Sequence, residues 1–377
     1  MINLLLRVGV LRKIRYEREL ERLPHDSPTT VQPIQSTLEQ LETISPCPPV
    51  QDSPAVFSAP ESIDLTVIVP VFNNRDYVDQ CLVSALSQKT RFSFEVIAVD
   101  DGSTDGSSGI LDALSNKFDH LKVIHQDNRG HSGARNSAIN IASGRFICFL
   151  DSDDFLPQGA FERLMRPATD QNADIVGSGY WSCLQSGAKR RYYGLRHGSF
   201  SSDSNPIRLS GLPWGSVYKR MLWDGVRFPE GYWFEDTVVP YLIFSRSSKI
   251  LSVTGSTYNY RTNLQGITSR SVQSKKGLDS FWVVLEMLKQ LKRLGIEMNQ
   301  RLFEQTLHQF GALLKVRVAA LDEDELALLF SACCSLIRAM TDHKDFSRPK
   351  DFWLAQLLDS FIERDYRHWQ TICRWMS

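Results

Sequence analysis

Three carboxylates stand close together near the middle of the chain, directly after a short apolar run. Residues 146–150 are apolar, and Asp151, Asp153 and Asp154 follow almost at once. In an extended backbone alternate side chains share a face, so Asp151 and Asp153 are predicted to point together and Asp154 away. Two convergent carboxylates suit a hard divalent cation, and Mg²⁺ or Mn²⁺ would keep coordination positions open for substrate phosphates. The same residues also fit a solvated acidic turn that caps the next helix, and their spacing does not decide between the two interpretations.

The apolar run itself predicts a strand that is buried on both faces of a parallel sheet. Side chains at the carboxyl end of such a strand lie where open α/β sheets bind ligands. Two other polar clusters follow strand-like runs in the same way, and three clusters at one edge of a sheet predict a binding crevice. The clusters are Asn73 and Asn74 after residues 65–70, Asp100 and Asp101 after residues 94–99, and the acids after residues 146–150.

Strand and helix patterns alternate through this part of the chain. Apolar and β-branched runs predict strands at residues 65–70, 94–99, 121–125 and 145–150, and helical periodicity fills the intervals at residues 75–88, 110–118 and 133–142. This alternation predicts an α/β fold with a mostly parallel sheet and right-handed crossovers. Beyond residue 278 the pattern becomes helical, with helices predicted at residues 281–294, 302–320, 323–340 and 352–375.

Composition limits the class of protein. The 377 residues can form one large domain with an appendage. Lys plus Arg and Asp plus Glu both total 43, so net charge gives no reason to expect a nucleic-acid partner. The seven cysteines show no CxxC spacing, which indicates reduced thiols in a cytosolic compartment. No apolar run approaches the roughly 18 residues that span a bilayer.

The N-terminal region reads as a helix followed by a linker. Residues 1–23 predict an amphipathic helix with a basic polar side, which either lies on the inner face of the cell membrane or docks on the domain or a partner helix. Its basic residues follow the apolar run, which is the wrong order for a secretory signal. Residues 24–62 hold many Pro, Ser, Thr and Gln residues and predict a flexible linker, with a short helical segment possible at residues 36–44.

Taken together, these motifs closely resemble the inverting glycosyltransferases of family 2, which have the GT-A fold. The resemblance covers roughly residues 64–270, and it implies a domain at 63–270 with a nucleotide-sugar half (63–155), an acceptor half (156–270) and helices beyond it (271–377). The matching segments of the first half are residues 66–73 with Tyr77, Gln88, 99–105, 128–130, 133–136 and 149–154. Those of the second half are residues 213–215, 218–220, 227–231, 234–236, 258–261 and 266–268.

The resemblance implies how the nucleotide sugar is held. Asp101 would accept a hydrogen bond from uracil, although as an alternative it caps the following helix. Arg135 would offer a charged fork near the nucleotide, with a surface salt bridge as the alternative. Asp153 would bind a divalent cation, Mn²⁺ or Mg²⁺, on the diphosphate, with support from Asp151. The remaining nucleotide-sugar contacts would come from Pro70, Val71, Phe72, Asn73 and Ser152.

The resemblance also implies the catalytic base and the acceptor site. Asp236 holds the position of the family's base, and Glu235 would orient the acceptor or the base. Both acids also suit the first turn of a helix, and the two roles are compatible. Trp214 and Trp233 are candidates for the acceptor site because rings pack on the C–H faces of sugars, although most rings here are expected in the core. The chain departs from the family pattern at His131 and Ser216.

The expected function is a metal-dependent inverting glycosyltransferase. It would move a sugar from a nucleotide sugar, expected to be UDP-linked, to a hydroxyl of a saccharide or lipid-linked acceptor in surface polysaccharide synthesis. A sugar nucleotidyltransferase is the alternative enzyme class, but residues 71–75 lack the glycine that its phosphate loop needs. A non-catalytic binding module is the third option, and it would be expected to lose Asp153 or Asp236.

Overall fold

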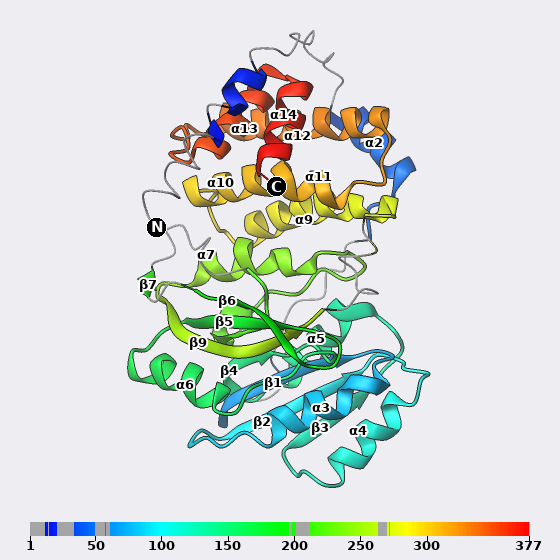
Figure 1. The fold of residues 1–377 in the computed structure, drawn as a ribbon, viewed down its shortest axis with the longest axis vertical. Helices are drawn as coiled ribbons and strands as arrows, with labels where there is room; N and C mark the ends of the chain where they lie inside the picture. The colour runs from blue at the N-terminus through cyan, green and yellow to red at the C-terminus, as the bar shows by residue number, and fades with distance from the viewer. Residues whose placement is uncertain are drawn as a thin grey trace. The chain divides into compact units, whose positions relative to one another are not determined.

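The computed structural model describes residues 12–13, 15–20, 34–49, 57, 61–195, 198–200, 211–262, 270 and 272–376. The chain divides into two units, which are drawn in Figure 1. One unit comprises Pro48–Leu264 and Glu286–Ile296 and contains the sheet. The other comprises Met1–Cys47, Gln265–Leu285 and Glu297–Ser377 and is helical.

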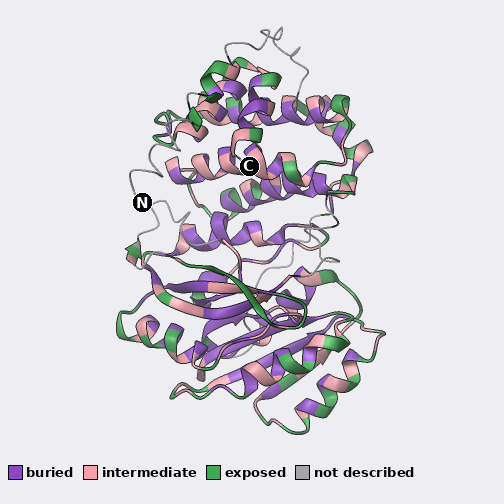
Figure 2. Ribbon diagram, viewed as in Figure 1, coloured by how far each residue is buried: buried purple, intermediate pink, exposed green. Residues whose placement is uncertain are grey.

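Four parallel strands form the first part of the sheet, in the order β3-β2-β1-β4. Most residues of β1, β2 and β4 are buried, as the purple strands of Figure 2 show, whereas β3 at the edge is only partly buried. Each connection between these strands contains a helix, so the predicted alternation is confirmed. The elements are β1 (Ile63–Val71), α3 (Arg75–Leu86), β2 (Phe94–Asp100), α4 (Ser107–Ser115), β3 (Leu121–His125), α5 (Gly130–Ile141) and β4 (Gly144–Phe149).

The sheet continues beyond β4 with mixed strand directions. β4 pairs antiparallel with β8, β8 pairs antiparallel with β5, and β5 pairs parallel with β9. β6 pairs only with β5, at the end of a hairpin, and β7 pairs with β9. The elements are α6 (Ala160–Asp170), β5 (Ile175–Cys183), β6 (Lys189–Tyr193), β7 (Gly198–Phe200), β8 (Ser216–Lys219), α7 (Phe244–Arg246) and β9 (Ile250–Arg261).

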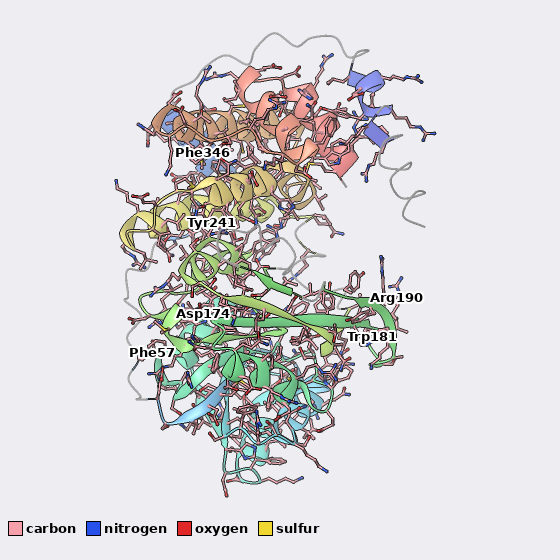
Figure 3. All side chains as sticks on the ribbon, turned by 90° about the vertical axis from the view of Figure 1, so that its left-hand side faces the viewer. Phe57, Asp174, Trp181, Arg190, Tyr241 and Phe346 are labelled. Atoms are coloured by element: carbon pink, nitrogen blue, oxygen red, sulfur yellow. The ribbon has the colours of Figure 1, made fainter. Side chains whose placement is uncertain are left out.

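A buried carboxylate joins three of these strands at one end of the sheet, at the start of β5 and β9 and at the end of β8. Asp174, labelled in Figure 3, precedes β5 and accepts hydrogen bonds from Lys219 of β8 (2.8 Å) and from Ser248 and Lys249, which precede β9 (2.7 and 3.0 Å). Burial works against its charged form, but these hydrogen bonds outweigh burial and lower the pKa of Asp174 to about 2. The ionised carboxylate therefore stabilises this end of the sheet.

The second unit confirms the predicted helical C-terminal region, with two differences. The predicted helix at residues 302–320 is interrupted at Gly311, whose backbone is not helical, and it ends at Arg317. The predicted helix at residues 352–375 is broken at Arg364, whose φ is +59°, and Asp365 then begins a new helix by accepting a hydrogen bond from His368 N (2.8 Å). The elements are α9 (Asp279–Arg293, which extends into the other unit), α10 (Gln300–His308), α11 (Leu314–Arg317), α12 (Glu323–His343), α13 (Phe352–Glu363) and α14 (Tyr366–Met376).

Part of the predicted linker is folded. Helix α2 (Ile34–Ile44) lies within residues 24–62 and packs against α12, with Thr37 and Leu41 fully buried. The carbonyl of Ser45 accepts a hydrogen bond from the indole of Trp282 (3.0 Å). The short helical segment predicted as possible at residues 36–44 is therefore present, and it is packed by its buried face rather than flexible. Most of the rest of the predicted linker lies outside the described residues.

The described residues of the N-terminal segment are helical at 12–13 and 15–20. The ring of Tyr16 is buried against Phe352, Trp353 and His368, and its hydroxyl lies 2.6 Å from His368 Nε2. These contacts agree with the interpretation that the segment docks on the protein. Among the described residues, no helix has both the length and the apolar character that a membrane span requires.

Candidate active site

The three polar clusters predicted at the strand ends come together. Asn73 Oδ1 accepts a hydrogen bond from the backbone N–H of Thr104 (2.7 Å), which joins the loops after β1 and β2. Asn74 Nδ2 donates to Ser152 Oγ (2.7 Å), which joins the loops after β1 and β4. The carboxyl ends of the strands therefore carry one connected site, and Asn73 and Ser152 hold it together.

The acids after β2 differ in their contacts. Asp100 accepts hydrogen bonds from Ser103 N (3.0 Å) and Ser108 Oγ (2.6 Å), so it stabilises its own loop. Asp101 is 2% exposed, and its Oδ1 accepts hydrogen bonds from Gln126 Nε2 (2.7 Å) and Arg129 N (2.9 Å). Burial raises the pKa of Asp101 above its ordinary value. These contacts fix Asp101 at the strand end, and its contact with uracil stays a prediction.

Residues 70–72, at the carboxyl end of β1, lie beside Asp101. Pro70 and Val71 are buried within the strand, and the carbonyl of Val71 accepts a hydrogen bond from Asp101 N (2.8 Å). Phe72, the next residue, is 50% exposed. Of the three residues predicted to frame the base, Phe72 is the one whose ring is accessible to a ligand.

The acidic loop, residues 151–154, has one carboxylate that faces the core. Asp154 is 1% exposed, and it accepts hydrogen bonds from Tyr258 Oη (2.7 Å) and Arg261 N (2.6 Å). The same Tyr258 hydroxyl accepts a hydrogen bond from Asp151 N (3.1 Å). Burial, followed by the charges of Asp153 and Asp151, raises the pKa of Asp154 well above its ordinary value. Asp154 thus anchors the loop, while Asp151 and Asp153 are partly exposed.

Arg261 is a second anchor of the acidic loop, and the sequence analysis gave it no role. Its Nε donates to the carbonyl of Asp153 (2.7 Å) and its Nη2 to Gln80 Oε1 (2.7 Å), while Nη1 donates to the carbonyl of Gln185. The guanidinium also lies over the ring of Tyr77, 4.7 Å from its centroid. The available signal was its place in the family-like segment at residues 258–261.

Arg135 connects the acidic loop with the segment that carries the predicted base. Its Nη2 donates to Asp151 Oδ1 (2.8 Å) and its Nη1 to Glu235 Oε1 (2.6 Å), and the guanidinium packs on the Phe228 ring, 5.0 Å from its centroid. The side chain is only 2% exposed. The alternative of a surface salt bridge is therefore wrong, because the Arg135 side chain is buried.

Glu235 is held in place on the other side of this bridge. It is 7% exposed, and its Oε1 also lies 3.5 Å from His131 Nδ1. Burial alone would raise its pKa, but His131 and Arg135 outweigh burial and lower the pKa of Glu235 to about 2. Its carboxylate is thus ionised and engaged by protein, which suits orientation of the neighbouring residue better than direct contact with an acceptor.

The predicted base, Asp236, follows directly on this fixed residue. Glu235–Thr237 form one 3₁₀ turn, and Val239–Ile243 continue as a short π-helix. Phe234, which precedes the turn, has a left-handed backbone with φ +63° and is 8% exposed. Asp236 itself is partly exposed. The bridge through Arg135 therefore places the segment of Asp236 beside the acidic loop.

Helix α5 also fixes the loop that leads to this turn. Asn136 exchanges two hydrogen bonds with the backbone of Phe228, donating to its carbonyl (2.9 Å) and accepting from its N–H (3.0 Å). Arg129 forms a two-pronged ion pair with Glu230 (2.7 and 3.2 Å). A Cβ at Gly133 would lie 2.3 Å from Arg129 Cβ, so glycine is needed for this close approach. These residues belong to the family-like segments 128–130, 133–136 and 227–231, but the sequence does not indicate that they contact one another.

The two predicted acceptor-site tryptophans differ. Trp214 is 7% exposed and packs among Tyr258 (4.4 Å between centroids), Tyr260 (5.3 Å) and Tyr180 (4.9 Å). Its ring supports the acidic loop through Tyr258, and the prediction of an exposed sugar platform is wrong for this residue. Trp233 is partly exposed beside Phe234, and its contact with an acceptor stays a prediction.

Asp151 and Asp153 could supply part of the ligand set of the expected divalent cation. Among the described residues, no three His, Cys, Asp or Glu side chains form a cluster that would hold a metal ion by themselves. Mg²⁺ is typically bound through one or two carboxylates together with substrate phosphates and water, and Mn²⁺ prefers similar oxygen ligands. The partly exposed Asp151 and Asp153 provide a donor set of that kind, although Arg135 already uses Oδ1 of Asp151.

Comparison with known proteins follows this geometry. Residues 66–218 match the family model described as glycosyl transferase family 2. Residues 66–218 are thus similar to the family 2 glycosyltransferases. It is 32% identical over 211 residues to the glycosyltransferase GlyA of Streptococcus pneumoniae, covering 52% of this chain and 30% of that protein. It is 30% identical over 218 residues to the uncharacterized glycosyltransferase EpsJ of Bacillus subtilis, covering 54% and 62%. The matched regions thus span 30% and 62% of the length of these two relatives.

A solved structure supports the fold assignment. S. aureus TarS 1–349, crystallised in complex with UDP-GlcNAc, superposes with a TM-score of 0.65 at 22% sequence identity, over 82% of this chain and 90% of that chain. At this identity the likeness concerns the fold. The expected GT-A fold is confirmed.

Proposed function

We propose that this protein is a metal-dependent glycosyltransferase that moves a sugar, with inversion, from a UDP-linked donor to a hydroxyl of a saccharide or lipid-linked saccharide acceptor. The observation that carries the proposal is the Arg135 bridge, which joins Asp151 to Glu235 and so brings the base segment beside the acidic loop. The family 2 match and the UDP-GlcNAc in the TarS structure support a nucleotide-sugar donor. Several relatives are glycosyltransferases, which supports a role in surface polysaccharide synthesis.

The reaction is a single displacement at the anomeric carbon. The acceptor oxygen forms a bond to this carbon on the face opposite the donor phosphate, and the bond to the phosphate oxygen breaks with its electron pair leaving on the nucleoside diphosphate. Asp236 accepts the proton of the attacking hydroxyl. Glu235, fixed by Arg135 and His131, orients the turn that carries Asp236.

The strand ends hold the donor. Asp101 accepts a hydrogen bond from the uracil imide, and the accessible ring of Phe72 packs on the base. Asp153 and Asp151 would hold the divalent cation, Mn²⁺ or Mg²⁺, whose charge, when it is bound, offsets the charge that develops on the leaving phosphate. Action at the inner face of the cell membrane stays a prediction.

A donor panel tests this proposal. Calorimetry with a series of nucleotide sugars, with and without Mn²⁺, is expected to give cation-dependent binding of a UDP-sugar, and the protein is expected to hydrolyse that donor slowly. Asp153→Ala is expected to abolish binding and turnover. Asp236→Asn is expected to retain donor binding but to lose turnover. The matched control is Asp119→Asn, an exposed acid before β3 at the opposite edge of the sheet, and it is expected to behave as wild type.

Three results would contradict the proposal. Release of pyrophosphate from a nucleoside triphosphate and a sugar phosphate would indicate a nucleotidyltransferase. Binding of a UDP-sugar without hydrolysis or transfer to any acceptor in a glycan panel would indicate a binding module. Absence of binding to every nucleotide sugar would remove the proposed donor class altogether.

A further inference from the structure

The hairpin of β5 and β6 carries a surface that is both cationic and aromatic. All five residues of β6 are exposed, and Tyr192 and Tyr193 each expose 40% of their surface. In Figure 3, β5 runs across the view from Asp174 to Trp181, and the label of Arg190 is next to that of Trp181. We call this the β6 surface, and its members are Lys189, Arg190, Arg191, Tyr192 and Tyr193.

The charge of the β6 surface has a single sign. Residues 175–202 contain no Asp or Glu, and neither does the adjacent strand β9. Within the described part of the chain, none of the three cations of β6 forms a salt bridge. Instead, the Lys189 ammonium lies over Trp181 (5.3 Å to the centroid) and the Arg191 guanidinium over Tyr193 (4.9 Å). The hairpin therefore carries three cations and no acid of its own, which produces a local positive field.

Ring contacts connect this surface with the acidic loop. Tyr193 stacks on Tyr180 (4.8 Å between centroids, 12° between planes), and Tyr180 contacts Trp214 edge-on (4.9 Å). Trp214 stacks on Tyr258 (4.4 Å), whose hydroxyl donates to Asp154. An unbroken series of aromatic side chains thus runs from the acidic loop to the exposed edge strand.

The turn of the hairpin also contacts the residues that hold the acidic loop. Arg261, which donates to the carbonyl of Asp153, donates in addition to the carbonyl of Gln185 in this turn. A Cβ at Gly187, two residues before β6, would lie 3.6 Å from the ring of Phe155, the residue that follows the acidic loop. The β6 surface therefore begins next to the site.

We propose that the β6 surface binds an anionic glycan acceptor, a saccharide or polyol chain bearing phosphodiester or carboxylate groups, beside the site. The proposal rests on the proposed function, because it names the acceptor class of the same site. Arginine forks pair with phosphate and carboxylate in two-pronged geometry, and exposed tyrosine and tryptophan rings pack on the C–H faces of sugars. The surface presents both kinds of group within a single strand.

A structural role for the same charges is the competing explanation. An edge strand exposes unpaired backbone groups, and charged side chains on it prevent pairing with another chain. That role requires no ligand, and it does not depend on whether a bound polymer is anionic or neutral. The two explanations therefore differ in a binding experiment.

The test uses the full chain and labelled polymers of similar length. The probes are poly(glycerol phosphate), polygalacturonate and dextran. Their binding to the protein is measured by fluorescence anisotropy at increasing NaCl concentration. We expect the anionic probes to bind, with affinity that falls as salt rises, and dextran to bind at least tenfold more weakly. Comparison of the phosphodiester polymer with the uronate polymer identifies the source of the negative charge.

Two triple variants with the same change in charge form a matched pair. Replacement of Lys189, Arg190 and Arg191 by Gln is expected to weaken binding of the anionic probe roughly tenfold or more. Replacement of Lys89, Lys117 and Arg145, exposed cations elsewhere in the same unit, by Gln is expected to leave it unchanged. Thermal unfolding of both variants checks that they fold as the wild-type protein does.

Single variants locate the polymer on one face of the hairpin. Arg191 lies opposite Ser182, on the face that also carries the Tyr180–Tyr193 pair, whereas Arg190 is the extra residue where the register shifts between the pairs Ser182–Arg191 and Cys183–Lys189. Because Tyr180 contacts Trp214 and so continues towards the acidic loop, Arg191→Gln is expected to weaken binding more than Arg190→Gln.

Several outcomes would overturn the inference. Equal losses in the two triple variants would mean a response to net charge alone, and no binding of either anionic polymer would leave edge protection as the role. Tighter binding of RNA or of phosphatidylserine vesicles than of either glycan, lost with the β6 triple variant, would identify a different partner. Donor binding by the wild-type protein is measured in parallel. Its absence contradicts the proposed function, whereas donor binding with no effect of β6 on glycan binding contradicts this inference alone.

Discussion

The two carboxylate-bearing segments of the site depend on different parts of the fold. The acidic loop at residues 151–154 is held from β9, through Tyr258 and Arg261. The segment that leads to Asp236 is held from α5, through Asn136 and Arg129. Arg135 donates hydrogen bonds to both segments, and His131 also lies 3.7 Å from Asp151 Oδ1 and 3.5 Å from Glu235 Oε1.

This difference separates the tasks of the two supports. Loss of a β9 anchor should disturb the carboxylates that face the donor, whereas loss of an α5 anchor should disturb the base. A change at Arg135 should affect both. The following variants test this division, beginning with the largest expected effect.

Arg135→Ala should have the largest effect, because it leaves the buried carboxylates of Asp151 and Glu235 without their partner. We expect the free energy of unfolding to fall by about 3–5 kcal/mol, measured by urea denaturation. Donor binding and turnover should both decrease. Arg135→Lys keeps the charge but loses the two-pronged geometry. Its free energy of unfolding should therefore lie between those of the wild type and the alanine variant, and it provides a folded sample if the alanine variant does not fold. Wild-type stability of Arg135→Ala would contradict the role of the bridge.

Gly133→Ala should act through α5. The added Cβ would lie 2.3 Å from Arg129 Cβ, and such overpacking costs up to about 3 kcal/mol. Turnover at saturating donor should decrease more than donor affinity, because the change displaces the Arg129–Glu230 pair. Gly109→Ala in α4 is the matched control, since its Cβ would have no neighbour within 4 Å, and it should be neutral or stabilising. A larger effect on donor affinity than on turnover would contradict the division.

Tyr258→Phe should act through β9. It removes the hydroxyl that donates to Asp154 and accepts from Asp151 N, and loss of a buried hydrogen-bond partner costs about 2 kcal/mol. Donor affinity should decrease more than turnover at saturation, as measured by calorimetry and steady-state kinetics. The opposite pattern would show that β9 and α5 do not have separate roles.

Asp174→Asn should change stability without changing the site. The native pKa of Asp174 is about 2, below its unfolded value, so its ionised form contributes about 1–2 kcal/mol of stability. This contribution is complete above the unfolded pKa, and it is lost as the pH falls from about 4 to about 2. The difference in unfolding free energy between wild type and Asp174→Asn should therefore be present at pH 7 and disappear near pH 2. A difference that is independent of pH would contradict the assignment.

The part of the site that could be predicted from the sequence is the part made by neighbouring residues. A buried strand followed by acids is a local pattern, and residues 146–154 show it clearly. Pairings between distant residues leave no such pattern. Arg135 and Glu235 are 100 residues apart, and the spacing of neither residue indicates the other.

The sequence pattern also did not predict which single side chains are buried. A tryptophan after a proline can form an exposed surface for a sugar or a buried support, and the sequence does not distinguish the two. Trp214 is buried. Likewise, the sequence allowed a short helix at residues 36–44, but it did not indicate that the helix Ile34–Ile44 packs against α12. In both cases the surrounding tertiary contacts decide, and these contacts come from other parts of the chain.

The left-handed backbone of Phe234 has a consequence for how the acceptor region can vary. This conformation costs about 1–2 kcal/mol in any residue with a Cβ, and the buried ring offsets that cost through packing. A smaller apolar residue would keep the cost and lose the packing, and a β-branched one would add further strain. Glycine or asparagine would preserve the reversal of the chain before Glu235 while emptying the space of the ring. Substitution at this one position therefore changes the space before Glu235 while it keeps the backbone that positions the proposed base, Asp236.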